Sequence, residues 1–76
     1  MKYTRQQEFL SQFGKRVREL RQQKGFSQEE LANYADLELS QINRIELGKI
    51  NTSISHVKVI ADALGVEPKV LFEVAG

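Results

Sequence analysis

Hydrophobic residues recur every three or four positions along most of the chain, a pattern that predicts amphipathic helices. A first, long helix is expected to begin between Thr4 and Glu8 and to end near Lys24, where Gly25 stops it. Its apolar positions at helical spacing are Phe9, Leu10, Phe13, Val17 and Leu20. Gly14 is a weak point within this helix, because glycine disfavours helix interiors.

Residues 27–48 predict two short helices joined by the turn Asp36-Leu37-Glu38. Ser27 can cap the first helix, and Glu30 stands three residues later, where it can complete a capping box. The expected inward positions are Leu31, Ala32 and Ala35 on the first helix, and Ile42 and Ile45 on the second. The outward positions of the second helix are Ser40, Asn43, Arg44 and Leu47, and Gly48 ends it.

The rest of the chain predicts two more helices. Ser53 or Thr52 would cap the fourth, which is expected to end at Gly65. Its inward positions are Ile54, Val57, Ile60, Ala61 and Leu64. Pro68 would start a fifth helix at the favoured first position. No segment alternates as a strand does, so we expect an all-α bundle of five short helices with residues 9–76 as one domain. Residues 1–8 would be an arm or one extra helical turn.

The two central helices have the residue types that a steep helix crossing needs. Ala32 is small enough to let two backbones approach, and Leu37 can plug the turn between the helices. Asp36 stands where the turn needs a positive φ, which Asp tolerates better than most residues. This constellation is a helix-turn-helix, whose second helix, residues 39–47, is shaped to enter the DNA major groove.

Three segments carry a resemblance to a known family. They are GKRVRELRQQKGFSQEELA, INRIELGK and VIADALGVEPKVLF. On these segments, residues 13–72 resemble the Xre family, the Cro and lambda-repressor-like DNA-binding domains. The chain departs from the family pattern in the turn and near the expected DNA contacts: Asp36 replaces the usual Gly, Glu38 the usual Ser or Thr, Leu47 a frequent polar residue, and Thr52 a frequent Pro.

The resemblance implies a DNA-facing role for the outer side of the second central helix. The positions that match are Leu39, Ser40, Gln41, Asn43, Arg44 and Leu47. Chemistry agrees for some of them, because Asn can bond adenine, Arg can bond guanine, and Leu can contact a thymine methyl group. The alternative is that these residues form only the polar outer face of an amphipathic helix.

Other roles implied by the resemblance lie outside that helix. Ser27 and Gln28, at the start of the first central helix, would contact DNA phosphate. Lys49 and Asn51 would add further phosphate contacts. Capping by Ser27 and ordinary loop polarity are the alternatives. The family also commonly joins the positions of Arg21 and Glu46 in a partly buried salt bridge.

Charge is distributed unevenly along the chain. Residues 1–24 contain seven Lys or Arg and two Glu, a balance of +5, whereas residues 25–48 contain one Arg and five acids, a balance of −4. The helix-turn-helix is therefore locally acidic. Attraction to phosphate would have to come from the basic first helix, Lys49 and the helix N-termini. The alternative is that the basic run is only a solvated helix face.

The sequence gives little support to an enzyme. His56 is the only histidine, there is no cysteine, and no residues have metal-ligand spacing. No metal, cofactor or small-molecule ligand is implied. No apolar run approaches the roughly 18–20 residues that cross a bilayer, and the N-terminus lacks a signal-peptide core. We expect a soluble, cytoplasmic protein.

The C-terminal third is more apolar than a surface requires. The residues left for a partner, once Leu71 enters the core, are Ile50, Ile54, Val70, Phe72 and Val74. They predict a homodimer on a two-fold symmetric operator, unless all of them cover the base of the core. The size suits a restriction–modification controller best among small Xre-like proteins. The competing class is an antitoxin or adaptor that uses the same fold to bind protein, favoured by the local acidity and by exposed Leu39 and Leu47.

Overall fold

The computed structural model describes residues 5–49 and 51–73. It contains four α-helices and one 3-10 helix. The elements are α1 (Arg5–Gln23), α2 (Gln28–Ala35), α3 (Leu39–Glu46), α4 (Ile54–Leu64) and the 3-10 helix η1 (Pro68–Phe72). No strand occurs within these ranges. Residues 5–8 form the first turn of α1, and residues 1–4 lie outside the described residues.

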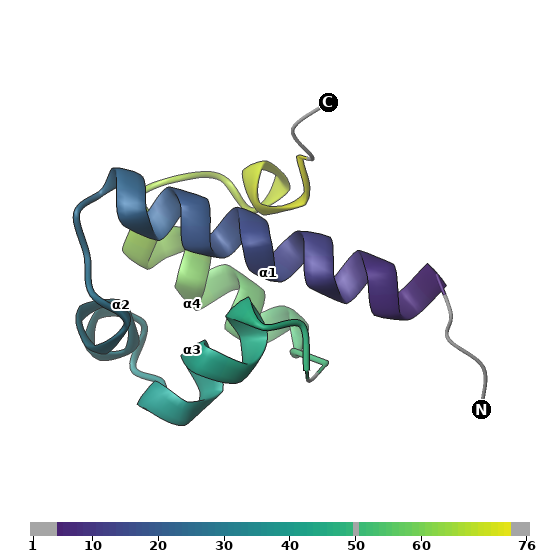
Figure 1. Ribbon diagram of the computed structural model, residues 1–76. Coiled ribbons are helices and arrows are strands. Elements are labelled where there is room, and N and C mark those ends of the chain that lie inside the picture. Colours follow the sequence, from purple (N-terminus) through teal and green to yellow (C-terminus); the bar gives the residue numbers. More distant parts are fainter. Residues whose placement is uncertain (1–4, 50, 74–76) are drawn as a thin grey trace.

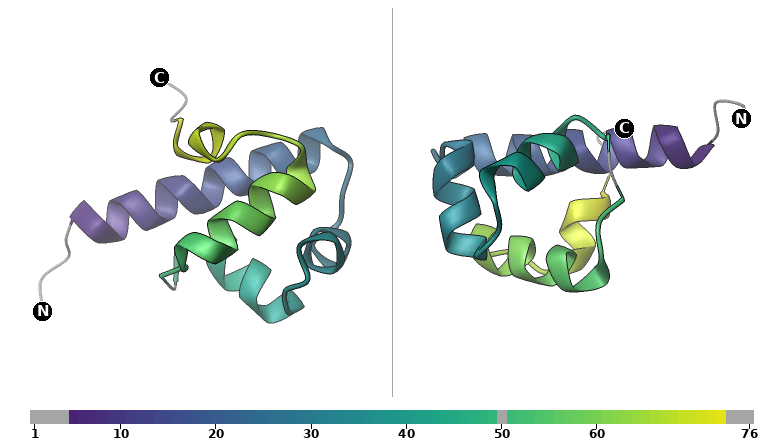
Figure 2. Two further views of the ribbon diagram at one scale, coloured as in Figure 1. Left: turned by 180° about the vertical axis from the view of Figure 1, so that it is seen from behind. Right: turned by 90° about the horizontal axis from the view of Figure 1, so that it is seen from below.

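The helices pack in a closed ring. Helix α1 contacts α3, α3 contacts α2, α2 contacts α4, α4 contacts η1, and η1 returns to α1. Figure 1 shows α1 as the long element that spans the molecule, with η1 above it and α3 below it. The view from below shows the ring most clearly, with α2 closing one end and η1 the other (Figure 2).

The core fills the inside of this ring. All five elements contribute to it, and its buried hydrophobic residues are Phe13, Val17, Leu20, Leu31, Ala32, Ala35, Ile42, Ile45, Ile60, Ala61, Leu64 and Leu71. The expected inward residues of α2 and α3 are all in this set. Most of those of α1 and α4 are also in it. Of the remaining expected inward residues, Leu10 and Val57 are only half-buried, and Phe9 and Ile54 are exposed.

The capping signals of the helix-turn-helix form as predicted. The Ser27 hydroxyl accepts a hydrogen bond from the Glu30 backbone N–H at 3.0 Å, and the Glu30 carboxylate accepts one from the Ser27 N–H at 2.8 Å. Asp36 has a φ of 58°, and Gly48 has a φ of 71°. Leu37 packs partly buried against the core from the turn. Ser53, rather than Thr52, caps α4.

The expected fifth α-helix is a 3-10 helix. Its backbone bonds span three residues, from Val70 N–H to the Glu67 carbonyl and from Glu73 N–H to the Val70 carbonyl. The Arg16 side chain of α1 donates a further bond to that same Val70 carbonyl at 3.0 Å. The Val70 carbonyl oxygen has two lone pairs and accepts both bonds, so α1 fastens η1 without displacing its own backbone bond. Short segments of this kind commonly adopt 3-10 geometry.

Two expected inward residues are not inward. Phe9 is 51% exposed and Ile54 is 88% exposed. Both have helical spacing relative to core residues, but they lie toward the N-terminal ends of α1 and α4. There η1 covers only part of Phe9, through its stacking with Phe72, and Ile54 remains almost fully exposed. Periodicity identifies the face of a helix that could be buried, whereas the length of the neighbouring elements decides how far along that face burial extends.

Replacing Asp36 by glycine is expected to stabilise the protein by about 1 kcal/mol, since glycine has no Cβ to strain at positive φ. Replacing it by alanine should destabilise the protein, because alanine keeps the Cβ and tolerates this conformation less well. Thermal melting of the three proteins checks the order. A glycine variant less stable than wild type would show that the Asp36 side chain does more in the turn than tolerate its φ.

Candidate DNA-binding surface

The outer face of α3 is open to solvent. Leu39 is 47% exposed and Leu47 is 55% exposed. Ser40, Asn43 and Arg44 are exposed between them. The opposite face carries the buried Ile42 and Ile45, so α3 is anchored by one side and presents the other.

An ion pair joins the C-terminal end of α3 to α1. Arg21 Nε lies 2.6 Å from Glu46 Oε2, and Arg21 Nη2 lies 3.0 Å from Glu46 Oε1. The Arg21 side chain is 11% exposed and that of Glu46 is 3% exposed. Arg21 Nη1 also donates to the Phe26 carbonyl at 2.9 Å. The salt bridge implied by the resemblance is therefore present, and the guanidinium also holds the loop before α2.

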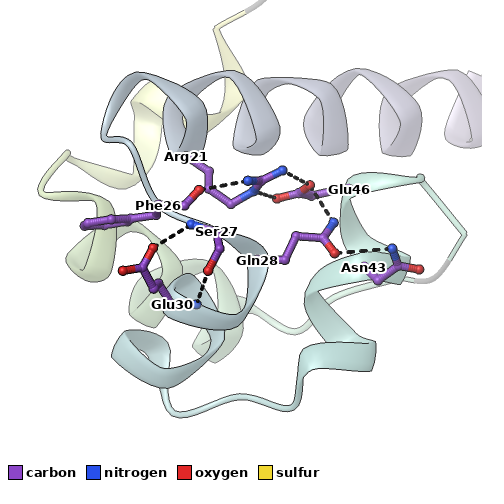
Figure 3. A network of polar contacts seen from close by, with 7 residues as sticks. All are labelled: Arg21, Phe26, Ser27, Gln28, Glu30, Asn43 and Glu46. Carbon is purple, nitrogen blue, oxygen red and sulfur yellow. Dashed lines mark hydrogen bonds and ion pairs between the residues drawn. The ribbon is translucent and has the colours of Figure 1, made fainter.

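Gln28, the first residue of α2, bridges this ion pair to the exposed face of α3. Its Nε2 donates to Glu46 Oε1 at 2.9 Å, and its Oε1 accepts from Asn43 Nδ2 at 3.4 Å. Figure 3 shows Arg21, Glu46, Gln28 and Asn43 in a continuous row. The N-terminus of α2 and the middle of α3 are thus held together by side chains.

Gln41 is occupied differently. Its Oε1 accepts a hydrogen bond from the Glu38 backbone N–H at 2.9 Å, and its side chain is half-buried. The side chain therefore satisfies a free donor at the start of α3. Its oxygen is committed to this local contact, unlike the exposed side chains of Ser40 and Arg44.

A close backbone contact sets the position of α3 against α1. Gly14 is buried in α1, and a Cβ built on it would lie 2.7 Å from the carbonyl oxygen of Glu46 and closer still to that of Ile45. Only a residue without a side chain fits there. The glycine that weakens α1 locally therefore lets α3 pack against it at backbone distance.

Charges near the exposed face are mixed. Among the described residues, the side chains of Arg44 and Lys49 are exposed and form no hydrogen bond or ion pair. Glu29 and Glu30 occupy the first turn of α2. Their negative charges stabilise the helix by interacting with the positive end of its dipole, but they repel an approaching phosphate. Arg21 neutralises Glu46 in the interior, so Glu46 adds little to the negative potential outside.

The basic residues of α1 are divided between two uses. Arg21 serves the buried ion pair, and Arg16 bonds Val70 and lies 3.6 Å from both Glu19 and Glu73. Lys15 and Arg18 remain exposed. Part of the positive charge that the sequence suggested for DNA attraction is therefore used to hold the fold together.

The expected phosphate contacts lie on two segments. Ser27 and Gln28 stand at the start of α2, although the Ser27 hydroxyl and N–H are both used in the capping box. Lys49 follows α3. Asn51 is exposed and lies beside Phe9 and Ile54 at an apolar groove. Asn51 is thus placed at the border between the polar and apolar surfaces.

Comparison with known proteins assigns the family. A family model described as helix-turn-helix, HTH_3, matches residues 17–71, more than half of the chain.

The chain belongs to the Xre-like helix-turn-helix family.

Two Xre-like relatives are 44% identical to this chain. One is the control protein C.BamHI of Bacillus amyloliquefaciens, which matches over 62 residues, covering 80% of this chain and 76% of that protein. The other is the crystal structure of the restriction-modification controller protein C.AhdI from Aeromonas hydrophila, with a TM-score of 0.82 over 83% of this chain and 96% of that chain. A hypothetical transcription factor, NHTF from Neisseria, is 28% identical, with a TM-score of 0.85 over 97% of this chain and 85% of that chain.

The Xre-like family consists of DNA-binding transcription regulators rather than enzymes, and this chain is a member of it. Within residues 5–49 and 51–73, no group of three His, Cys, Asp or Glu side chains is placed to hold a metal ion. In the same part of the chain, no helix is both long and apolar enough to cross a bilayer.

Two features of this Xre-like surface were not predicted from the sequence. The bridging role of Gln28 has no local signal, because it depends on residues 18 and 15 positions away. The position of Gly14 does indicate its role, although the sequence suggested only a weak point in the helix. Gly14 stands three residues before Val17, on the inward face of α1. A glycine on such a face indicates close approach of another backbone.

Proposed function

We propose that this protein is a homodimeric controller that binds a two-fold symmetric operator and regulates transcription of restriction–modification genes. The observation that carries the proposal is the open polar face of α3, held on a rigid scaffold, in a chain 44% identical to two control proteins. Because its target is DNA, its proposed place of action is the cytoplasm.

In this proposal α3 enters the major groove. Asn43 and Arg44 contact base edges, Ser40 supports them, and Leu39 and Leu47 contact thymine methyl groups or the sugar-phosphate wall. Lys49, Asn51, the Ser27 O–H and the backbone N–H of Gln28 at the N-terminus of α2 contact phosphate, while the Gln28 side chain stays bonded to Glu46 and Asn43. Gln41 contributes chiefly by capping α3, because its oxygen is already bonded.

Arg44→Ala and Asn43→Ala are expected to change sequence preference, each by about 1–3 kcal/mol at its own base pair. Lys49→Ala should instead weaken binding to every sequence and reduce the slope of log affinity against log salt. Selection from a pool of random DNA duplexes, followed by binding titrations at several salt concentrations, separates the two behaviours.

Each outcome has a distinct meaning. An Arg44→Ala variant that behaves like Lys49→Ala would make Arg44 a phosphate contact. Weak binding of the wild-type protein to all duplexes at every salt concentration would favour the protein-binding adaptor instead.

The proposed dimer surface is an apolar groove of about 590 Å³. It lies between the N-terminal half of α1, the start of α4, and η1, and its apolar lining is Phe9, Leu10, Phe13, Ile54, Val57 and Phe72. Phe9 and Phe72 stack at the groove with ring centroids 5.9 Å apart. Figure 1 shows η1 on the opposite side of α1 from α3, so a partner docked near η1 leaves the outer face of α3 free.

The members of the expected interface have different exposures. Ile54 is 88% exposed and Phe72 is 43% exposed, whereas Val70 is half-buried against the core. Ile50 and Val74 lie outside the described residues. Phe9 was not expected to take part, and its exposure extends the proposed surface onto α1.

Ile54→Asp is expected to convert the dimer to monomer and to weaken operator binding, since a charge would be buried in an apolar contact. Ile54 is almost fully exposed in the single chain, so folding of the monomer should be little affected. Ser55→Asp is the matched control, because it places the same charge in the same helical turn at an exposed neighbour. Sedimentation at micromolar concentration is the measurement. A wild-type protein that is monomeric both free and on DNA would contradict the dimer.

A further inference from the structure

The buried ion pair of Arg21 and Glu46 continues outward through two amide side chains. Glu46 Oε1 accepts from Gln28 Nε2 at 2.9 Å, and Gln28 Oε1 accepts from Asn43 Nδ2 at 3.4 Å. We call Gln28 and Asn43 the amide relay. One end of the relay is on a carboxylate that is 3% exposed, and the other is on the exposed face of α3 (Figure 3).

The direction of every bond in this row is forced. A guanidinium has only donors and a carboxylate has only acceptors, so Arg21 must donate to Glu46. Since Glu46 can only accept, Gln28 must present its NH₂ group to it. The Gln28 carbonyl oxygen then faces the other way, toward Asn43, and Asn43 must present its own NH₂ group to that oxygen. In Figure 3 the Asn43 oxygen accordingly points away from Gln28.

We propose that Gln28 is a positioning residue for base recognition: it holds Asn43 with its carbonyl oxygen facing outward, so that Asn43 selects a base carrying an amino group in the major groove. This inference rests on the proposed function and adds the chemistry of one base contact to it. Adenine and cytosine carry such an amino group, whereas guanine and thymine present carbonyl acceptors there.

Adenine fits the oriented amide best. One N–H of Asn43 is directed to Gln28, and the second remains free. Asn43 can then accept from the adenine N6 amino group and donate to adenine N7, which is the bidentate arrangement of Asn with adenine. Without Gln28, an exposed amide can rotate and offer either its oxygen or its NH₂ group, so it discriminates less between amino-bearing and carbonyl-bearing bases.

Loss of a residue that positions Asn43 should affect DNA binding differently from loss of a phosphate contact. A phosphate contact fixes the protein on the duplex and carries no direct sequence information, so its loss weakens all sequences alike. A positioning residue for Asn43 acts at one base pair. Gln28→Met tests this difference, because methionine keeps the length of the side chain and removes both polar groups. Arg21 still bonds Glu46 in this variant, so the buried ion pair is retained.

The experiment selects binding sites from a random duplex pool with wild type, Gln28→Met, Asn43→Ala and the double variant. Gln23→Met is the matched control, since Gln23 is an exposed glutamine at the end of α1. We expect the wild type to prefer adenine at one position by about tenfold or more. Gln28→Met should reduce that preference to about threefold or less, at the same position that Asn43→Ala changes. In the double variant, loss of Gln28 should have no further effect on base preference.

A second measurement follows the relay in the free protein. The side-chain NH₂ resonances of Asn43 in an ¹H–¹⁵N spectrum should shift in Gln28→Met and stay unchanged in Gln23→Met. Unchanged Asn43 resonances in Gln28→Met would overturn the inference, as would a uniform loss of affinity with an unaltered base profile. Additive effects of the two substitutions on base preference would overturn it too. If the Asn43 resonances shift in Gln28→Met but the wild-type protein enriches no sequence from the pool, the proposed function is overturned, and the recognition role of the relay with it.

Discussion

Replacing Glu46 by alanine is expected to lower the free energy of unfolding by about 3–5 kcal/mol. The substitution leaves the Arg21 guanidinium, whose side chain is 11% exposed, without the carboxylate that accepts two of its hydrogen bonds. It also leaves the Gln28 NH₂ group without its acceptor. A domain of 76 residues has a total stability of about 4–11 kcal/mol, so this loss would remove a large part of it.

Thermal melting measures this effect, which should lower Tm by roughly 12 °C or more. Asp62→Ala is the matched control. Asp62 pairs with Lys58 at 2.8 Å, a distance close to that of the buried pair, but both side chains are about 60% exposed. Removing a surface carboxylate of this kind should cost about 0.5 kcal/mol or less. Equal stability of Glu46→Ala and wild type would rule out the structural role given to the pair.

Gly14→Ala is expected to destabilise the protein by about 3 kcal/mol, at the upper end of the range for overpacking. The added methyl group would collide with the backbone carbonyls of Ile45 and Glu46. Backbone cannot rotate away as a long side chain can, so α1 and α3 would have to separate. In an exposed helix the same substitution would stabilise, by about 1 kcal/mol, because alanine is the better helix former.

The sign of the effect therefore tests the packing directly. Denaturant unfolding should show Gly14→Ala less stable than wild type. Gln12→Ala, at an exposed position of the same helix, should differ from wild type by only about 0.5 kcal/mol. Operator binding by Gly14→Ala should weaken as well, since α3 carries the proposed base contacts. A more stable Gly14→Ala variant would mean that α1 and α3 are not held at backbone distance.

Local signals in the sequence determined the helix-turn-helix. Ser27 and Glu30 form the capping box, Asp36 takes the positive φ of the turn, and Gly48 ends α3 as expected. Each of these features depends on residues within a few positions of one another. Such short-range bonds and steric limits operate largely independently of the rest of the chain, which is why residue type and spacing predicted them.

Burial was predictable only where neighbours cover a helix along its length. The periodicity of α1 and α4 is correct, yet Phe9 and Ile54 remain exposed at their N-terminal ends. The 3-10 form of η1 was also not predicted, and neither was the bond from Arg16 to the Val70 carbonyl, which crosses 54 positions of sequence. These outcomes depend on which elements meet, and a local pattern contains no information on that.

The surface proposed to bind DNA also has features that the sequence predicted and features that depend on the tertiary structure. The sequence by itself determined which side chains stand on the outer face of α3, because a 3.6-residue period places Ser40, Asn43 and Arg44 opposite Ile42 and Ile45. Only the tertiary structure decided how they are held. Gln28 reaches Asn43 and Glu46 because α1, α2 and α3 converge at one point, and α1 and α3 converge so closely because Gly14 lacks a side chain. Contacts among three helices depend on their relative placement, which follows from packing of the whole core.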